Sequence, residues 1–290
     1  MTRVASAARS VIDVLRLSTE YLEKHQSASP RLDAELLLAH ALGVRRIDLY
    51  LMHDRPLQGP ELTTARELVR RRGLGEPVAY ITGTREFYTR AFDVDPSVLI
   101  PRPETETLVE VALREVRARG RWSTLADLGT GSGCIAVTLA AELPSQRVVA
   151  VDSSEAALAV ARRNAERLGV AERVRFVAGD WGAPLPEPAD VVVSNPPYVT
   201  TAELAAAARD VRDFEPRGAL DGGADGLDAY RALAASLHGR VRTGATILLE
   251  VDHRRAREVA ALVIAAFPGA AAVRHQDLTH RDRVVEVRLA

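Results

Sequence analysis

The sequence predicts an α/β fold in which a mostly parallel sheet carries helices on both faces and follows a small all-helical segment. Three observations predict this fold. Strand-like and helix-like segments alternate from Thr124 to the end of the chain. A glycine-rich loop follows the first of these strands and opens a helix. Residues 1 to about 75, by contrast, show only the spacing of helices.

The N-terminal segment, 1–75, is expected to form a helical domain. Apolar side chains from Val11 to Leu22 share one face at helical spacing, and Ser10 and Asp13 match a capping pair. A second helix begins at Ser29-Pro30 and stops at Gly43. Further helices are expected near Arg46–Met52 and over Pro60–Arg72. Because the segment holds no cluster of catalytic residue types, it is either a structural bundle or a docking domain for a macromolecular partner.

Residues 76–100 are expected to form a β-hairpin that links the helical domain to a second domain, 101–290. Glu86–Tyr88 and Ala91–Val94 alternate as the two strands of a hairpin do. A helix follows from Glu104 to about Arg119, with acidic residues in its first turn, where the helix dipole favours negative charge.

The sheet and its helices are expected to alternate from Thr124 onward. Strands are expected at Thr124–Leu128, Arg147–Val151, Val174–Ala178, Ala189–Ser194 and Thr246–Val251. Helices are expected at Cys134–Leu143, Ser154–Leu168, Gly226–Gly239 and Arg254–Phe267. Two strand-like runs, Ala270–Leu278 and Val284–Leu289, end the chain without a helix between them, so we expect this last pair to be antiparallel.

The composition excludes several classes of protein. The net charge of -1 lacks the basic excess of a general nucleic-acid binder. Lys24 is the only lysine, which removes lysine nucleophiles and a P-loop from consideration. Cys134 is the only cysteine, so an internal disulfide and a cysteine-based zinc site are impossible, and we expect no metal. The N-terminus lacks the apolar core of a signal peptide, and we expect a soluble cytoplasmic protein.

The glycine-rich loop is the first candidate for a binding site. Gly129, Gly131 and Gly133 follow a strand directly, and glycines there let the backbone approach a ligand closely. Gly131 and Gly133, with Ala136, also satisfy the pattern of a dinucleotide-binding loop, and Asp152 lies about 20 residues further on, where a ribose carboxylate is expected. A nicotinamide or flavin enzyme therefore stays open at this point.

The charge around the loop favours a different ligand. We expect the Asp127 carboxylate to face the position of a pyrophosphate, which like charges would disfavour. S-adenosylmethionine has an amino group and a sulfonium and no phosphate, so it suits this environment. Asp152 would then accept hydrogen bonds from its ribose hydroxyls, and Asp180 and Trp181, after the third strand, suit an adenine ring.

The second candidate is the run Asn195-Pro196-Pro197-Tyr198, which closes an apolar strand. Two consecutive prolines make a rigid corner, so the Asn195 side-chain oxygen and the Pro196 carbonyl are available as acceptors. Such a corner suits an NH2 group on a flat adenine, cytosine or glutamine. Holding both N–H bonds would aim the nitrogen lone pair at a methyl donor, with Tyr198 packed on the flat group. The motif is that of amino-group methyltransferases and does not by itself distinguish a base from an amide.

The sequence as a whole resembles the protein-glutamine methyltransferases of peptide chain release factors, the bacterial PrmC/HemK family. The motifs that carry the resemblance are Glu76–Gly83, Arg85–Tyr88, Ile100–Glu106, Asp127–Gly133, Asn195–Val199, Asp213–Arg217 and Leu220–Gly223. The resemblance implies a helical N-terminal domain, a hairpin and a seven-stranded class I (Rossmann-like) methyltransferase domain. It also implies transfer of a methyl group from S-adenosylmethionine to the glutamine of the Gly-Gly-Gln motif in class I release factors, leaving S-adenosylhomocysteine.

The resemblance also implies site residues. Positions that match the family's cofactor site are Gly129, Thr130, Gly131, Ser132, Gly133, Asp152, Trp181 and Asn195. Positions that match its catalytic and substrate-binding motif are Asn195, Pro196, Pro197 and Tyr198. A segment expected to lie over the cofactor contains Arg102, Pro103 and Glu106.

One position departs from the family pattern, and two other functions stay open. Asp252 stands after Glu250-Val251 where the family usually has glycine, which puts the shape of that loop in question. The main alternative function is a DNA adenine methyltransferase, although the net charge of -1 and the lack of a basic run disfavour it. A non-catalytic binding module would need neither the proline corner nor the glycine loop. We expect no membrane partner and no direct DNA binding.

Overall fold

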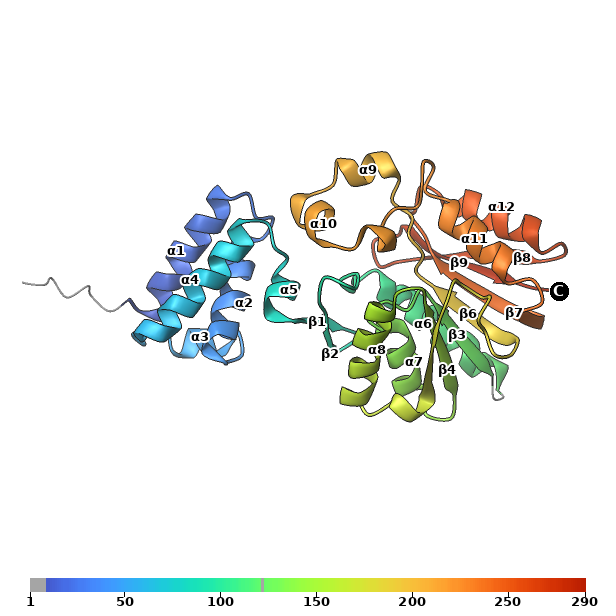
Figure 1. The fold of residues 1–290 in the computed structure, drawn as a ribbon, viewed down its shortest axis with the longest axis horizontal. Coiled ribbons are helices and arrows are strands. Elements are labelled where there is room, and N and C mark those ends of the chain that lie inside the picture. Colours follow the sequence, from blue (N-terminus) through green and yellow to red (C-terminus); the bar gives the residue numbers. More distant parts are fainter. Residues whose placement is uncertain (1–8, 121–122) are drawn as a thin grey trace, which may run out of the picture. The chain divides into compact units, whose positions relative to one another are not determined.

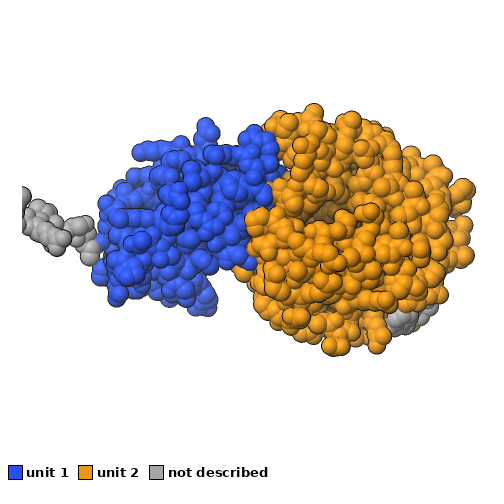
Figure 2. Space-filling view, in the orientation of Figure 1, with its two compact units in different colours: residues 1–83, 209–214 blue, residues 84–208, 215–290 orange. Residues whose placement is uncertain are grey.

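The computed structural model describes residues 9–120 and 123–290, which fall into two compact units. Unit 1 contains the chain up to Gly83 together with Arg209–Phe214, and unit 2 contains Thr84–Ala208 and Glu215–Ala290 (Figure 2). The first eight residues of the predicted helical domain lie outside the described residues.

Unit 1 is a bundle of helices around one apolar core (Figure 1). Its elements are α1 (Val11–Lys24), α2 (Pro30–Leu42), α3 (Asp48–Leu51), α4 (Gly59–Gly73), α5 (Val78–Thr82) and α10 (Arg209–Phe214). The predicted N-terminal cap is present, because Ser10 and Asp13 form a capping box at α1. Gly43 ends α2 with a φ of 65°, a conformation that glycine adopts without strain.

Two elements of unit 1 were not predicted. Helix α5 lies in the segment expected to be a linker and follows Pro77. Helix α10 comes from far along the chain and is joined to the bundle by Arg72, whose guanidinium reaches Asp210 at 3.3 Å and Asp33 at 2.7 Å. Because the Arg72 side chain is only 10% exposed, these two carboxylates neutralise a charge that has little access to water.

Unit 2 is built on a seven-stranded sheet in the order β5-β4-β3-β6-β7-β9-β8. The strands are β3 (Thr124–Leu128), β4 (Arg147–Asp152), β5 (Val174–Ala178), β6 (Ala189–Ser194), β7 (Val241–Glu250), β8 (Ala271–Gln276) and β9 (Asp282–Arg288). All neighbouring pairs from β5 to β7 are parallel. Strand β9 is antiparallel to both β7 and β8, which confirms the predicted antiparallel ending.

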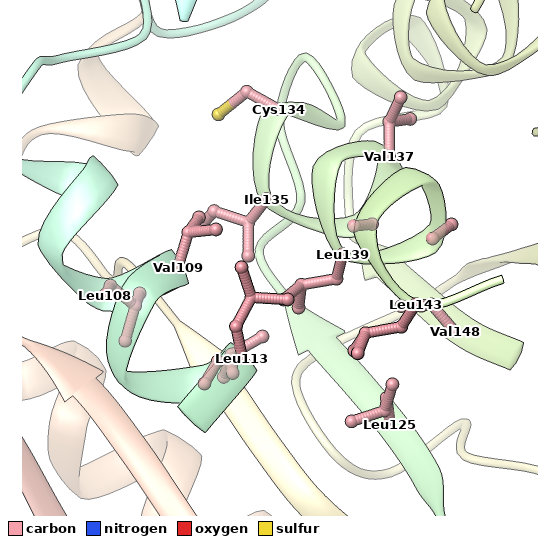
Figure 3. Close-up of a cluster of buried hydrophobic side chains, with 14 of the residues drawn as sticks. Leu108, Val109, Leu113, Leu125, Cys134, Ile135, Val137, Leu139, Leu143 and Val148 are labelled. Carbon is pink, nitrogen blue, oxygen red and sulfur yellow. The ribbon is translucent and has the colours of Figure 1, made fainter. Parts of the chain in front are cut away.

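Helices cover both faces of this sheet, as predicted (Figure 1). Helices α6 (Thr105–Arg119), α7 (Cys134–Glu142) and α8 (Glu155–Arg167) share one core with alternate strand residues such as Leu125. Figure 3 shows Val109 and Leu113 of α6 facing Ile135 and Leu139 of α7 within this core. Helices α11 (Asp228–Ser236) and α12 (Ala256–Ala266) share the core on the other face. The short helix α9 (Thr201–Ala205) follows the loop after β6.

The predicted hairpin is present and packs into the core of unit 2. Strands β1 (Thr84–Phe87) and β2 (Arg90–Asp93) pair antiparallel. Phe87 and Phe92 are buried in the core that contains α6 and α7, with their rings edge to face at 6.0 Å. The hairpin is therefore anchored by two aromatic rings.

Strand β3 lies between β4 and β6, so the order of the sheet reverses at its carboxyl end. Ligands of open α/β sheets bind at such a point. In the described parts of the chain, 9–120 and 123–290, no helix has the length and apolar character needed to cross a bilayer. The same residues hold no group of three or more His, Cys, Asp or Glu side chains arranged to ligate a metal.

Candidate active site

A cavity of about 270 Å³ opens in unit 2 at the carboxyl ends of the parallel strands. The loops after β3, β4, β5 and β6 supply much of its wall. Predicted site residues on this wall are Gly129, Gly131, Asp152, Trp181, Asn195 and Pro197. The remaining wall comes from residues 97–99 and from Pro216, Gly218 and Ala219. The structure thus brings the two candidate motifs, the glycine loop and the proline corner, to one cavity.

The glycine loop is held from behind by a buried acid. Asp127 is fully buried, and its Oδ2 accepts hydrogen bonds from the Thr130 hydroxyl at 2.6 Å and the Ala136 N–H at 3.1 Å. Burial raises the pKa of Asp127 to about 7. The expectation that this carboxylate faces the ligand is wrong, because Asp127 does not line the cavity and instead fixes the loop that does.

Three of the positions matched to the cofactor site do not line the cavity. Thr130 and Ser132 are each 3% exposed, and the Thr130 hydroxyl is directed at Asp127. Gly133 begins α7 at a φ of 79°, and a Cβ there would lie 3.0 Å from Ala161. These residues shape the loop, while Gly129 and Gly131 present its backbone to the cavity.

Asp152, at the end of β4, combines exposure to the cavity with a fixed orientation. Its Oδ2 accepts from the Gly131 N–H at 2.8 Å, and its Oδ1 accepts from the Ser154 N–H at 2.9 Å. A carboxylate oxygen can accept more than one hydrogen bond, so both oxygens retain capacity for ligand hydroxyls. The predicted ribose acceptor is therefore oriented before any ligand arrives.

Trp181 lines the cavity in an unusual backbone conformation. Its φ is 47°, which costs free energy for a bulky side chain and tends to occur at functional sites. The following residue is fixed, because the Gly182 N–H donates to Ser236 Oγ at 2.9 Å. A Cβ on Gly129 would lie 3.6 Å from the Trp181 ring, so the ring lies directly against the glycine loop, with Asp180 beside it on the wall.

The proline corner begins where β6 meets β3. The Ser194 hydroxyl donates to the Leu128 carbonyl at 2.6 Å, which ties the ends of these two strands together. Asn195 lies on the cavity wall, and its Nδ2 donates to Thr105 Oγ1 at 3.1 Å. The Asn195 Oδ1 therefore remains as an acceptor. Pro197 lines the cavity, whereas Pro196 is buried.

Tyr198 connects the corner to a second buried acid. Its hydroxyl donates to Glu250 Oε1 at 3.3 Å, and its ring packs on the core that contains α11 and α12. Burial and the nearby Glu250 carboxylate raise the pKa of Tyr198. Glu250 is fully buried at the end of β7, and its pKa is raised to about 7, chiefly by burial.

The backbone of the corner is packed against two glycines. A Cβ on Gly222 would lie 2.8 Å from the Pro197 carbonyl, and one on Gly226 would lie 2.6 Å from the Tyr198 carbonyl. Neither distance is possible for a real side chain, so only glycine fits at these positions. The Val199 N–H also donates to the Leu220 carbonyl at 3.0 Å, which joins the corner to the loop after α10.

Residues 102, 103 and 106 do not line the cavity but hold its surroundings. Arg102 forms an ion pair with Glu215, whose carboxylate also accepts from the Ile100 N–H at 3.1 Å. Glu215 therefore joins the segment before α6 to Pro216, which lines the cavity. Glu106 accepts from the Tyr88 N–H at 2.9 Å and so holds the hairpin turn. Pro103 is exposed.

Sequence reasoning assigned no site role to Thr105, Glu215 or Glu250. Thr105 is 2% exposed and holds Asn195, and Glu215 and Glu250 are also buried. Thr105 and Glu215 lie inside the motifs that carried the family resemblance, which was the available signal. Their partners are distant in sequence, so spacing alone could not reveal them.

Two other residues that the sequence singles out can be compared with the structure. Cys134, the only cysteine, is buried in the core of α6 and α7, and burial raises the pKa of its thiol to about 12. Asp252 does not adopt a positive φ, so its position does not demand glycine. Its carboxylate accepts from the Arg254 N–H at 2.8 Å and shapes the loop itself.

Family profiles match both parts of the chain. A profile described as the PrmC N-terminal domain matches residues 13–83, and one described as the methyltransferase small domain matches residues 105–212. The second match covers the glycine loop and the proline corner together. It favours a methyltransferase over the dinucleotide enzyme that the glycine spacing left open.

Solved structures share the fold of this chain. The hMettl16 catalytic domain in complex with MAT2A 3'UTR hairpin 6 has a TM-score of 0.55 at 16% identity, covering 77% of this chain and 82% of that one. The T. thermophilus 16S rRNA N2 G1207 methyltransferase, in complex with AdoMet and guanosine, has a TM-score of 0.52 at 17% identity, covering 71% of this chain and 50% of that one. At such identities the likeness shows the class I methyltransferase fold alone.

Curated relatives match at much higher identity and over most of their length. A release factor glutamine methyltransferase of Nitratidesulfovibrio vulgaris is 43% identical over 90% of this chain and 89% of its own. That of Cereibacter sphaeroides is 44% identical over 96% and 98%, and that of Burkholderia pseudomallei is 47% identical over 82% and 86%. With the N-terminal profile and the site geometry, these matches lead to one conclusion: the chain belongs to the release factor glutamine methyltransferase family.

Proposed function

We propose that this protein transfers a methyl group from S-adenosylmethionine to the side-chain amide nitrogen of the glutamine in the Gly-Gly-Gln motif of class I peptide chain release factors. The products are the N5-methylated glutamine and S-adenosylhomocysteine. One observation carries the proposal. Asn195 lies on the cavity wall with its Nδ2 engaged by Thr105, so that its Oδ1 is free to accept from an NH2 group.

The residues around the cavity fit the cofactor. Asp152 would accept from the ribose hydroxyls, and Asp180 and Trp181 would hold the adenine by its edge and its face. The loop Gly129–Gly133 would lie close to the ligand, because Gly129 and Gly131 carry no side chain that would fill the space. The cofactor supplies an electrophilic methyl group on a positively charged sulfur.

The protein's own contribution to the reaction is positioning. The nitrogen of a carboxamide is a poor nucleophile because its lone pair is delocalised into the carbonyl group. Asn195 Oδ1 and the Pro196 carbonyl would accept the two N–H bonds and hold the nitrogen with its lone pair directed at the methyl carbon. Such alignment contributes up to roughly 7–11 kcal/mol to lowering a barrier. The nitrogen becomes acidic only after it has gained the methyl group, so no strong base is needed.

The helical unit 1 is proposed to bind the release factor, with residues 1–75 as the docking domain, 76–100 as the hairpin linker and 101–290 as the methyltransferase domain. The match of residues 13–83 to the PrmC N-terminal domain supports this assignment. Release factors act in translation, so we propose a cytoplasmic protein. Neither a membrane nor DNA is expected as a partner, because the chain has a net charge of -1.

The test offers labelled S-adenosylmethionine and three acceptors to the purified protein: a class I release factor, the same factor with its Gly-Gly-Gln glutamine changed to alanine, and duplex DNA. We expect label on the first acceptor alone. Label on the alanine variant at the same rate would overturn the choice of glutamine, and label on DNA alone would overturn the choice of substrate class.

A further inference from the structure

The Glu250 carboxyl group lies buried beneath the proline corner. Among the described residues, it forms no ion pair. Its Oε1 accepts from the Tyr198 hydroxyl at 3.3 Å, and its Oε2 has no hydrogen-bond partner. A buried carboxyl group without a charged partner costs free energy. Its position at the end of β7, next to residues that touch the cavity, indicates a role in the site.

Thr105 lies between this acid and the cavity. Its Oγ1 accepts from Asn195 Nδ2 at 3.1 Å, and its side chain also interacts with the Glu250 carboxyl group, whose pKa it lowers. A hydroxyl has one hydrogen to donate, and an ionised carboxylate can only accept. Because Thr105 accepts from Asn195, its own hydrogen stays available to the nearby Glu250 carboxylate, whose Oε2 has no hydrogen-bond partner. We infer that the polar groups are ordered in one direction, from the Asn195 amide through Thr105 toward Glu250.

We propose that Thr105 and Glu250 are positioning residues that lock the Asn195 carboxamide with its oxygen toward the substrate. This inference rests on the proposed function, in which that oxygen accepts an N–H bond of the glutamine amide. A carboxamide turned by 180° would present its own NH2 group to the substrate NH2, and two donors cannot bond. Thr105 and Glu250 thus keep Asn195 Oδ1, an acceptor, facing the substrate. This favours an amide over a carboxylate as substrate.

The ionisation of Glu250 supports this assignment. Its pKa is raised to about 7 by burial, although Thr105, Arg283 and Tyr198 lower it. The titratable, charged or hydroxyl-bearing groups that interact with Glu250 are Glu104 and Thr105 of the α6 start, Cys134 of α7, Tyr198 after β6, Tyr230 of α11 and Arg283 of β9. Above pH 7 the ionised carboxylate can only accept, so it takes the Thr105 hydrogen. The protonated carboxyl group can also donate, so it no longer fixes which way the Thr105 hydroxyl points. We expect the methyl transfer rate to rise with pH through this range.

Three variants of the full chain test the proposal with a release factor as substrate: Glu250→Gln, Thr105→Val and Thr105→Ser. Glu250→Gln and Thr105→Val keep the size of the side chain and remove the directed chain of hydrogen bonds. We expect each to lower kcat by about 10²-fold, the loss typical of a misplaced reacting group. The affinity for S-adenosylmethionine and the KM for the release factor should change little. Thr105→Ser keeps the hydroxyl and should recover most of the activity.

The pH profile separates positioning from a structural role. The wild-type protein should show a rise in kcat near pH 7 that Glu250→Gln lacks. If the acid is only structural, Glu250→Gln should keep wild-type kcat, since it removes a buried charge and leaves the shape intact. Wild-type kcat in both Thr105→Val and Glu250→Gln would overturn the proposal, and if Glu250→Gln fails to fold, the Thr105→Val and Thr105→Ser pair decides alone. A wild-type protein that does not methylate the release factor would contradict the proposed function itself.

Discussion

The two loops that form the site rest on similar buried acids but are built in different ways. Asp127 lies behind the glycine loop and binds Thr130 and Ala136, which follow it closely in the chain. Glu250 lies behind the proline corner and interacts with Thr105 and Tyr198, which belong to distant segments. Burial raises the pKa of both acids to about 7. The acid behind the glycine loop thus binds its own neighbours in the chain, whereas the acid behind the proline corner interacts with segments that the fold brings together. We call the glycine loop the local loop and the proline corner the assembled corner.

This difference separates two tasks. The local loop offers backbone to a ligand, so its defects should appear first as weaker cofactor binding. The assembled corner offers one oriented side chain, Asn195, so its defects should appear as slower methyl transfer. Variants of each loop test whether the two tasks are separable.

The largest effect is expected from Asn195→Ala. The variant loses the acceptor for the substrate amide, and we expect kcat to fall by about 10²–10³-fold, the range found when one oriented polar contact to the reacting group is removed. The affinity for S-adenosylmethionine, measured by calorimetry, should stay within a few-fold. Wild-type turnover would refute the role of Asn195, and an equally large loss of cofactor affinity would show that the two tasks are coupled.

Asp127→Ala should give the opposite result. The Thr130 hydroxyl and the Ala136 N–H lose their acceptor in a buried position, at a cost of about 1–3 kcal/mol each. We expect the cofactor affinity to fall by about 10²-fold, with a smaller change in kcat at saturating cofactor. Asp127→Asn retains an acceptor oxygen and is the matched control, which should bind within about tenfold of the wild type. Equal cofactor affinity in all three proteins would contradict the role given to Asp127.

Gly222→Ala tests the backbone of the corner. The added Cβ would lie 2.8 Å from the Pro197 carbonyl, so the corner must shift. We expect kcat to fall about tenfold, less than for Asn195→Ala, because the acceptor is displaced and not removed. Gly59→Ala is the control, since a Cβ there meets nothing within 4 Å. An unchanged kcat would mean that the corner tolerates the shift.

The same comparison explains how much could be predicted from sequence. Signals carried within a few residues were read correctly, including the Ser10 cap, the end of α2 at Gly43 and the antiparallel last pair of strands. Helices α5 and α10 were missed, although the equally short α3 was expected near Arg46–Met52, because elements of four to six residues show too little periodicity to be distinguished reliably from turns.

The residues of the candidate site also fall into those that local sequence predicts and those that it does not. Gly129, Gly131, Asp152 and Trp181 lie on the cavity, where the ends of consecutive strands were expected to place them. The orientation of Asp127 was wrong, because the sequence shows that an acid precedes the loop and not on which side it lies. Tertiary contacts alone define the roles of Thr105, Glu215 and Glu250.

Asp127 and Glu250 should also both make the free energy of unfolding depend on pH. Each has a pKa near 7 in the folded protein and about 4 when unfolded, so the folded state binds more protons between these values. The free energy of unfolding should therefore decrease as pH rises from about 4 to 7, by up to about 1.4 kcal/mol per pH unit for each acid, and level off above 7.

Urea unfolding of the cofactor-free protein across this range measures the slope. Asp127→Asn and Glu250→Gln should each flatten it, because the replaced acid no longer titrates. Asp54→Asn, at a side chain that is 86% exposed, is the control and should keep the wild-type slope. A slope that is the same in all four proteins would mean that neither acid carries a raised pKa.

The smallest effect is expected from Asp252→Gly, which restores the residue usual in the family. Asp252 follows Glu250 closely, yet it belongs to a separate surface cluster with Arg254 and Arg255, which lower its pKa to about 2. Because Asp252 has no positive φ, glycine relieves no strain there and only removes these contacts. We expect a loss of about 1 kcal/mol in unfolding free energy and kcat within about twofold of the wild type. A large fall in kcat would show that the loop after β7 helps to orient Glu250. This loop would then be one more segment on which the position of Asn195 depends, although no hydrogen bond among the described residues joins it to the proline corner.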